Sequence, residues 1–317
     1  MAAYYLQFEK PIQVLDDKIL ELEATNNSNQ SIIKEISALM AERSKLILEI
    51  YSNLSRWQRV QLARHPNRPF ALDYINYFSP EFIELHGDRY FMDDPAVVTG
   101  LGYFSGRKVA WIGQQKGRST KENLHRNFGM MRPEGYRKAL RVMKLAEKFK
   151  LPVITLIDTM GAYPGIGAEE RGQGEAIARN LIGMASLEVP IIGAVIGEGA
   201  SGGALGIGLC DHFLMMENTW YSVISPEGCA SILYRDAARA EDAADALKLI
   251  PDDLKKIGIC DTIINEPDGG AHRNFNASAD LLQTALIESL DGLSDMAPES
   301  LLDGRIKKYD QLGIFQD

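Results

Sequence analysis

The sequence predicts an α/β protein with parallel strands, and three observations support this fold class. The apolar runs LPVITLIDT (151–159) and VPIIGAVIG (189–197) show little alternation, which is typical of strands covered on both faces. A glycine-rich segment follows each run. A helical pattern comes next, from about Glu169 to Leu187 in the first unit and over ALGIGL in the second. Repeated units of this kind predict a parallel sheet with right-handed crossovers.

The composition fits a folded chain of one large domain with an appendage, or of two domains. Of the 317 residues, 45% are hydrophobic and 24% are charged, which allows a sizeable core. The net charge of -9 argues against a general nucleic-acid binder. Cys210, Cys229 and Cys260 lie far apart, which excludes a four-cysteine zinc site and fits a reducing compartment. Because neither a signal-peptide pattern nor an apolar run of spanning length is visible, we expect a cytoplasmic protein.

The first elements are expected as a helical hairpin over residues 11–52. Apolar residues recur at helical spacing, with Pro11 at a suitable first position, and the run TNNSNQS separates the two helices. The second series is heptad-like, with one charged interruption at Arg43. The apolar positions are Ile12, Leu15, Ile19 and Leu22, then Ile32, Ile36, Leu39, Leu46 and Ile50. We expect residues 1–55 to be either a surface helix pair on its own domain or an arm that contacts another subunit.

Residues 53–96 carry few clear elements. ARHPNRP (63–69) and HGDRYFMDDP (86–95) are predicted loops because proline and glycine interrupt them. His65 and His86 each lack a companion at metal-ligand spacing, so structural roles are favoured.

A β-hairpin is predicted next, with VVTGLGYF and RKVAWIGQQ joined by the turn Ser105-Gly106. Residues 116–138 then hold seven Lys or Arg against two Glu in an acidic protein. We interpret this run as a contact for an anionic group such as a phosphate or carboxylate, with a solvated loop as the alternative. A helix is expected from about Pro133 to Phe149.

The last third of the chain is predicted as short strands and helices. HFLMM and WYSVI are strands, and Ser225-Pro226-Glu227 begins a helix because proline suits its first turn. AEDAADALKL and PDDLKKIG are short helices, CDTII is a strand, and an amphipathic helix begins near Asn276. We expect residues 56–295 to form one domain and residues 296–317 a polar tail.

The two glycine-rich segments, 160–170 and 198–203, are the candidate site. Each lies where a strand ends and a helix begins, so backbone N–H groups without helical partners and the helix dipole can stabilise an anion there. Glycine lets a ligand approach the backbone closely. Two such junctions in successive units predict a site that binds and polarises a carbonyl beyond the carboxyl ends of the strands.

Two common motifs also match the second segment. GEGASG fits the dinucleotide pattern GxGxxG, with Glu217 near the place of a ribose-binding acid, but the following helix is too short for that fold. GASGG fits a nucleophile elbow at Ser201, and Asp261 and His272 follow in hydrolase order. Serine beside glycine is also common as a helix cap, so a serine hydrolase stays an alternative. A P-loop is excluded, because no glycine turn is followed by Lys and then Ser or Thr.

Longer segments resemble a known family. IDTMGAYPGIGAEERGQGEAIARNL, VIGEGASGGALGIG and YSVISPEGCASIL, with RNFGM, PEGYRKALR and GGAHRN, closely resemble the carboxyltransferase alpha subunit of bacterial acetyl-CoA carboxylase. The likeness runs in order from near Ala63 through Arg273, and the N-terminal helix pair also fits. One departure is Met160, where the family usually has proline, which alters the stiffness of that turn.

The resemblance implies a crotonase-like fold of ββα units and the transfer of carboxylate from carboxybiotin to acetyl-CoA, giving malonyl-CoA for fatty-acid synthesis. It implies a heterotetramer of two alpha and two beta chains that works with biotin carboxyl carrier protein and biotin carboxylase. The zinc-binding motif is expected in the beta chain, with no metal in this one.

The family's paired glycines correspond to Gly202 and Gly203, whose N–H groups are expected to stabilise the ureido oxygen of biotin. Gly161, Ala162 and Gly165 of the other glycine-rich segment are expected to shape the biotin pocket. Arg171 and Arg126 are expected to bind a carboxylate or phosphate, with salt bridges within the domain as the alternative. A stand-alone crotonase-type hydratase or isomerase is a further alternative, for which Glu198 and Glu227 are candidate acids or bases.

Overall fold

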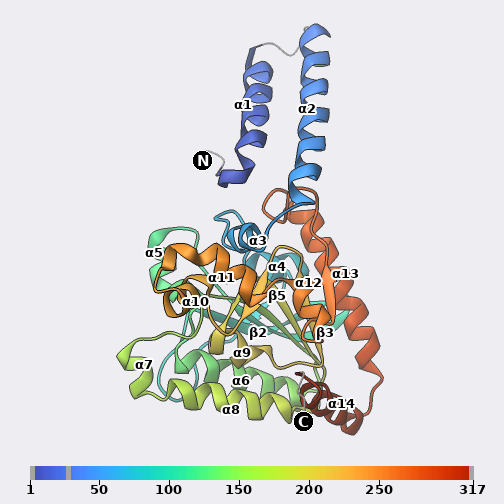
Figure 1. Cartoon of the computed structure of the whole chain (residues 1–317). Coiled ribbons are helices and arrows are strands. Elements are labelled where there is room, and N and C mark those ends of the chain that lie inside the picture. Colours follow the sequence, from blue (N-terminus) through green and yellow to red (C-terminus); the bar gives the residue numbers. More distant parts are fainter. Residues whose placement is uncertain (1–3, 26–29, 314–317) are drawn as a thin grey trace.

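The computed structural model describes residues 4–25 and 30–313, and its centre is one mixed sheet covered by helices on both faces (Figure 1). The neighbours in the sheet run in the order β1, β2, β3, β4, β5, β6, β8, and β7 pairs with the distal part of β5. The strands are β1 (Ile83–Glu84), β2 (Val97–Phe104), β3 (Arg107–Gln114), β4 (Val153–Thr159), β5 (Ile191–Ala200), β6 (His212–Met216), β7 (Trp220–Ser222) and β8 (Thr262–Ile264).

The first three strands pair antiparallel, and β3, β4, β5, β6 and β8 run parallel. This arrangement confirms the predicted hairpin and the two parallel apolar strands. All seven residues of β4 and all ten of β5 are buried. Strands covered on both faces need no alternation, because each side chain meets a hydrophobic layer whichever way it points.

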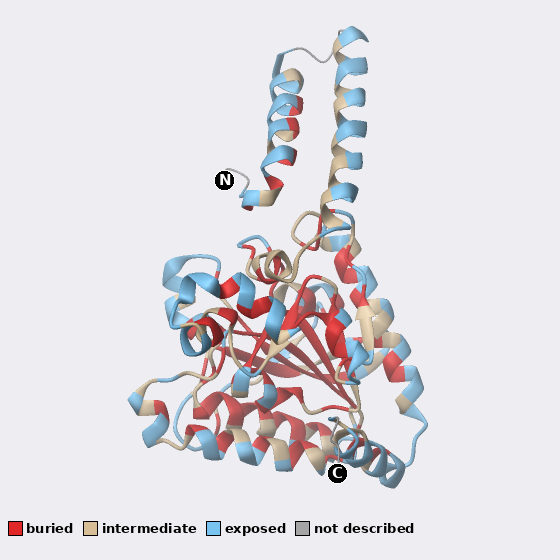
Figure 2. Ribbon diagram, in the orientation of Figure 1, coloured by how far each residue is buried: buried red, intermediate tan, exposed pale blue. Residues whose placement is uncertain are grey.

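Two hydrophobic layers enclose the sheet, which stands out as the buried centre of Figure 2. Alternate residues of β5 divide between them: Ile191 and Val195 join one layer, and Ile192 and Ile196 join the other. The first layer is built with α6 (Pro133–Lys148), α8 (Gln173–Ala185) and α9 (Ser201–Gly208). The second is built with α4 (Ala71–Phe78) and α13 (Phe275–Ser294).

The N-terminal helices form the predicted hairpin, which extends away from the sheet (Figure 1). They are α1 (Lys10–Thr25) and α2 (Gln30–Tyr51); part of the predicted linker, 26–29, lies outside the described residues. The charged interruption at Arg43 lies in the seam, where its Nη1 is 2.9 Å from Oδ1 of Asp16. An ion pair thus fills a position at which a heptad would place an apolar residue.

The remaining helices are short, apart from the C-terminal helix α14 (Pro298–Asp310), which is described below. They are α3 (Arg56–Ala63), α5 (Thr120–His125), α7 (Ile166–Glu170), α10 (Pro226–Leu233), α11 (Ala240–Leu247) and α12 (Pro251–Lys256), with 3-10 turns η1 (Gln7–Glu9), η2 (Asn127–Gly129) and η3 (Ala237–Arg239). Within residues 4–25 and 30–313, no helix is both long and apolar enough to cross a membrane.

Three segments differ from the sequence-based expectation. The helical run from about Glu169 is split into α7 and α8 by Gly172, whose φ of +81° belongs to the left-handed region. The segment EGASGG is no turn, because β5 continues to Ala200 and α9 begins at Ser201. The expected polar tail contains α14 (Pro298–Asp310), whose buried Arg305 pairs with Asp211 at 2.7 Å.

Candidate functional site

The candidate site lies at the carboxyl ends of β4 and β5. After β4 the chain turns through Gly161, which has a φ of +142°. After β5 it enters α9 at Ser201, whose φ of +55° is unusual for a residue with a side chain. This sharp entry directs the start of α9 toward the end of the neighbouring strand, so both glycine-rich segments meet at one edge of the sheet.

The two segments are in direct backbone contact. A Cβ atom added to Gly203 would lie 2.2 Å from the carbonyl carbon of Gly161 and 2.7 Å from the amide nitrogen of Ala162. Glycine at position 203 therefore allows one turn to pack on the other. The hydroxyl of Thr159 donates to the carbonyl oxygen of Gly129 at 2.7 Å, which holds the end of η2 beside the same two segments.

A buried amide links the first turn of α9 to the end of β4. Nε2 of Gln114, the last residue of β3, donates to the carbonyl oxygen of Gly203 at 2.7 Å. Its Oε1 accepts from the amide N–H of Asp158 at 3.2 Å. Gln114 is fully buried, so both bonds form away from water, where leaving either partner unpaired is costly.

The first turn of α9 can stabilise negative charge. Its N-cap residue is Ala200, and no side chain of the described chain caps it. The N–H groups of Gly202 and Gly203 belong to the turn whose donors have no helical acceptors, and the helix dipole adds partial positive charge. Gly202 is partly exposed. An oxyanion that reaches this edge of the sheet can therefore receive backbone hydrogen bonds.

A chain of charged side chains surrounds the same strand ends. Nζ of Lys116 lies 2.7 Å from Oδ1 of Asp158 and 2.8 Å from Oε1 of Glu198. The other oxygen of Glu198 accepts from Nε of Arg64 at 2.6 Å. Arg64 in turn pairs with Glu227 at 2.5 Å. Five residues that are far apart in sequence thus form one connected network.

The network shifts the acidity of its carboxyl groups in opposite directions. Burial alone would raise the pKa of Glu198, but the charges of Lys116 and Arg64 outweigh burial and hold it below its usual range. For Asp158, burial prevails over the attraction of Lys116 and raises the pKa. The pKa of Glu227 is also low, because Arg64 outweighs the effect of burial. Glu198 and Glu227, the candidates for a stand-alone hydratase, are therefore ion-paired and weak as proton acceptors.

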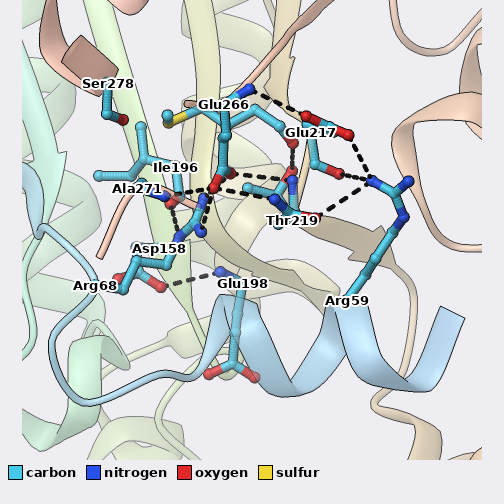
Figure 3. Close-up of polar contacts among 12 residues, drawn as sticks. Arg59, Arg68, Asp158, Ile196, Glu198, Glu217, Thr219, Glu266, Ala271 and Ser278 are labelled. Atoms are coloured by element: carbon cyan, nitrogen blue, oxygen red, sulfur yellow. Dashed lines mark hydrogen bonds and ion pairs between the residues drawn. The ribbon is translucent and has the colours of Figure 1, made fainter. Parts of the chain in front are cut away.

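Asp158 and Arg68 determine the path of β5 before the site. The pairing of β4 with β5 shifts register between Ile157 and Thr159, where the carboxylate of Asp158 accepts from the amide N–H of Glu198 at 3.0 Å (Figure 3). Buried Arg68 donates to the carbonyl oxygen of Ile196 at 2.6 Å and pairs with Glu266 at 2.6 Å (Figure 3). The loop ARHPNRP thus contributes structurally through Arg64 and Arg68.

A cavity of about 590 Å³ opens beside this network. Lys116, Arg64, Glu198 and Glu227 lie on its polar side. Apolar groups complete it, among them Phe70, Phe128, Met160 and Trp220. Met160, the departure from the family pattern, is thus part of the cavity wall.

The other residues with a predicted substrate role have protein partners or lie nearby. The guanidinium of Arg171 is hydrogen-bonded to buried Glu134, and Nη1 of Arg126 donates to the carbonyl oxygen of Pro95 at 2.9 Å. Gly165 and Arg171 line a second cavity of about 380 Å³. Of the predicted residues, the structure brings Gly161, Ala162 and Gly203 into contact, with Gly202 adjacent in sequence. Arg126 and Arg171 do not share that contact.

The predicted serine, acid and histidine set is not assembled. Ser201 begins α9, whereas Nε2 of His272 lies 3.3 Å from Oε1 of Glu9. Asp261 accepts from the amide N–H of Phe213 at 2.6 Å. Ser201 does not cap α9 either, because the N-cap is Ala200. The hydrolase alternative therefore has no structural support.

Glu9, His65 and His272 form the single group within the described residues whose ligand atoms could surround a metal ion. Nδ1 of His65 accepts from the amide N–H of Asn67 at 3.1 Å, so its Nε2 carries the proton and faces the carbonyl oxygen of Tyr4 at 3.3 Å. Both ring nitrogens of His65 are thus engaged, which fits the structural role expected for it.

Sequence reasoning did not identify Gln114, Asp158 or Arg64 as part of the site, and it covered Lys116 only as the first residue of the basic run 116–138. One signal was present in the sequence. Gln114, Gln115 and Lys116 lie at or just after the end of one buried apolar strand and Asp158 lies near the end of another, and polar side chains in such places need partners. The partners of Arg64 could not be found by spacing, because Glu198 and Glu227 lie more than a hundred residues away in sequence.

Known structures with a similar fold include a transcarboxylase and a malonate decarboxylase. Transcarboxylase 12S aligns with a TM-score of 0.58 and 18% identity, over 73% of this chain and 44% of that one. A Pseudomonas malonate decarboxylase hetero-tetramer aligns with a TM-score of 0.59 and 15% identity, over 76% and 93%. At this low identity the likeness shows the fold alone, which is the expected crotonase-like fold.

Sequence comparison reaches further than fold. A family model described as acetyl co-enzyme A carboxylase carboxyltransferase-like matches residues 5–313. The acetyl-coenzyme A carboxylase carboxyl transferase subunit alpha of Oceanobacillus iheyensis is 53% identical over 98% of both chains. The protein of the same name from Thioalkalivibrio sulfidiphilus is 56% identical over 99% of this chain and 98% of its own. The chain therefore belongs to the alpha-subunit family of acetyl-CoA carboxylase carboxyltransferases.

Proposed function

We propose that this chain is the alpha subunit that transfers carboxylate from carboxybiotin, on its carrier protein, to acetyl-CoA, giving malonyl-CoA for fatty-acid synthesis. The full-length likeness to alpha subunits supports this function. One structural observation carries the mechanism: the uncapped first turn of α9 lies at the end of β5 and packs on the turn that follows β4.

The reaction requires stabilisation of one developing charge. When carboxybiotin loses its carboxyl group, negative charge develops on the ureido oxygen, and the N–H groups of Gly202 and Gly203 are proposed to donate to that oxygen. Donors that are already aimed need no reorganisation in the transition state. Gly161, Ala162 and Gly165 are proposed to shape the biotin pocket. A substrate role for Arg171 or Arg126 requires exchange of their present bonds to Glu134 and Pro95.

The proton of the acetyl methyl group is proposed to pass to biotin itself. Glu198 and Glu227, two carboxylates that line the cavity beside the proposed site, are held by Arg64 and have lowered pKa values. A group with a lowered pKa is a poor base for carbon acids. The ureido anion left by decarboxylation is a stronger base and is already at the reacting carbon.

Partners complete the proposed enzyme. We propose a heterotetramer of two alpha and two beta chains, with a zinc-binding motif in the beta chain and with biotin carboxyl carrier protein and biotin carboxylase as further components. The proposed compartment is the cytoplasm, which the free, buried thiols of Cys210, Cys229 and Cys260 support.

The test compares the purified chain alone, the beta chain alone and their mixture in malonyl-CoA-dependent carboxylation of a biotin derivative. We expect negligible transfer by either chain alone and robust transfer by the mixture. Robust turnover by this chain alone, at a rate that the beta chain does not change, would overturn the proposal.

A further inference from the structure

Lys116 is the cation that joins Asp158 and Glu198 in the buried network, and it also faces the cavity. Its ammonium group lies between the carboxylates of Asp158 and Glu198, which are both almost fully buried. It also lines the cavity of about 590 Å³, and 11% of its side chain is exposed. The residue is thus held from one side by the protein and open to the cavity on the other.

The two carboxylates do not use all of the hydrogen-bonding capacity of Lys116. An ammonium group has three N–H bonds. Within the described chain, Asp158 accepts one at 2.7 Å and Glu198 accepts one at 2.8 Å. The pKa of Lys116 is raised, because the attraction of these carboxylates exceeds the effect of burial, so the group stays charged and keeps its third N–H.

Lys116 is not the only cation that contacts Glu198. Glu198 already receives a hydrogen bond from Arg64 at 2.6 Å. Asp158, whose raised pKa reflects burial, also accepts from the amide N–H of Glu198. A neutral side chain with an acceptor oxygen at position 158 could therefore keep the strand contact without the charge that Lys116 compensates.

The location connects Lys116 with the proposed site. Asp158 lies three residues before Gly161, and Glu198 lies four residues before Gly202, so the ammonium group is held by the ends of both strands that lead into the glycine turns. Met160, the neighbour of Gly161 in sequence, lines the same cavity. The cavity wall thus includes both Lys116 and the residue next to Gly161.

We propose that Lys116 contacts the substrate: its remaining N–H donates to a ligand oxygen that carries or develops negative charge in this cavity. The proposal rests on the proposed carboxyl transfer. Two such oxygens take part in that reaction, the ureido oxygen of biotin and an oxygen of the transferred carboxylate, and their shared chemistry is that of an sp² oxygen. Lys116 would act with the backbone donors of α9 and would supply the full charge that they lack.

The experiment separates substrate contact from support of the fold. Lys116→Met alone leaves two buried carboxylates with less compensation and is expected to lower stability. In Lys116→Met/Asp158→Asn one positive and one negative charge are removed together, and the asparagine oxygen still accepts from the N–H of Glu198. Asp158→Asn is the matched control, because it makes the same change with Lys116 retained. All variants are assayed in complex with the beta chain.

We expect the double variant to match the Asp158→Asn control in melting temperature and assembly, and to fall about 10²–10³-fold below it in carboxyl transfer, the loss typical of one oxyanion donor. A raised KM for malonyl-CoA alone assigns the contact to the carboxylate, and a raised KM for the biotin derivative alone assigns it to the ureido oxygen; a lower kcat with both KM values unchanged assigns it to the transition state. Equal kcat and KM in the double variant and its control would overturn the proposal.

A second variant keeps the test decisive if the double variant fails to fold. Lys116→Arg retains the charge that compensates both carboxylates but moves the donors. Substrate contact predicts a lower transfer rate at an unchanged melting temperature, whereas equal activity and stability would overturn it. An inactive wild-type complex would instead contradict the proposed carboxyl transfer, so the two failures are distinguishable.

Discussion

Gly203 and Gly161 are in such close contact that a single methyl group on Gly203 would lie 2.2 Å from the carbonyl carbon of Gly161. The contact joins two turns whose sequence positions are more than forty residues apart. Position 203 therefore requires glycine for packing. A Cβ added to Gly202 would meet only the terminal carbon of the Ile177 side chain, at 3.3 Å. The two glycines are therefore separable by mutation.

We predict that Gly203→Ala lowers stability by about 1–3 kcal/mol, because the backbone of one turn must move away from the other. Transfer activity should fall together with the melting temperature, measured by calorimetry on the same preparation. Gly203→Ala with a wild-type melting temperature would show that the turns can separate at no cost.

At Gly202 we predict the opposite pattern. Gly202→Val should leave folding and assembly near wild type, because the Ile177 side chain can move, but its branched side chain should block a ligand and lower kcat about 10²–10³-fold. Gly202→Ala is the matched control for helix propensity, which favours alanine by about 1 kcal/mol. A near-normal kcat in assembled Gly202→Val would rule out this turn as the site of charge stabilisation.

Ser201→Gly should preserve carboxyl transfer. The φ of +55° at Ser201 suits glycine, and relief of the left-handed conformation, about 1 kcal/mol, offsets the greater freedom of glycine in the unfolded chain. The melting temperature and transfer rate should stay close to wild type, and a serine-directed fluorophosphonate probe should not label the wild-type chain. Stoichiometric labelling at Ser201 that is lost in His272→Ala would favour a hydrolase.

Arg171→Leu tests whether this arginine supports the fold or binds substrate. Glu134, its partner, is fully buried and has Arg137 as a second, longer contact at 3.5 Å. Loss of the charged hydrogen bond should lower stability by about 1–3 kcal/mol with unchanged KM values. Arg171→Leu/Glu134→Gln should regain part of the loss. A raised KM at an unchanged melting temperature would instead identify Arg171 as a substrate contact.

Stability should fall in mild acid because the pKa values of His65 and Glu9, which lie near the start of the N-terminal hairpin, are lowered in the folded chain. Burial lowers the pKa of His65 to about 4, so between pH 6.5 and 4 the unfolded chain binds a proton that the folded chain does not. Burial alone would raise the pKa of Glu9, but hydrogen bonds from His272, Leu6 and Tyr51 outweigh it and lower the pKa to about 2, so its stabilising effect is lost as pH falls from 4.5 toward 2.

The measurement is the melting temperature between pH 7 and pH 4.5. His65→Gln should flatten its decline with falling pH, because glutamine does not titrate. Exposed His125→Gln is the control and should leave the slope unchanged. An identical slope in wild type and His65→Gln would show that His65 does not contribute to the acid sensitivity.

Local patterns determined which segments form elements. Each correctly predicted feature depends only on residues that are close in sequence. Examples are the apolar runs of β4 and β5, the turn at Ser105-Gly106 and the helical spacing of α1 and α2. Such features depend on the alternation or recurrence of side chains, which tertiary contacts here did not override. The family likeness likewise depends on the order of residues alone, and it predicted the crotonase-like fold before any contact was known.

The end of β5 was decided by tertiary contacts. Glycines in EGASGG indicated a turn, but a Cβ on Gly199 would lie 2.5 Å from the ring of Tyr221, and one on Gly197, just before the segment, would lie 2.3 Å from the carboxylate of Asp158. Those glycines make room for neighbouring side chains and let the strand continue to Ala200. Nothing in the local sequence distinguishes a glycine that bends the chain from one that admits a neighbour.

The charged network was likewise beyond the sequence alone. Arg64, Lys116, Asp158, Glu198 and Glu227 come from five separate segments, and the local sequence around each does not indicate which of the others it meets. Their meeting depends on the strand order, which places the ends of β3, β4 and β5 side by side, and on α3 and α10 covering that edge. Burial then makes each charge depend on its partner, because an unpaired charge in that place would be too costly to keep. The sequence by itself thus determined the hairpin strands, the two buried apolar strands, the N-terminal helix pair and the family, and the tertiary structure decided where β5 ends and which charges face the cavity.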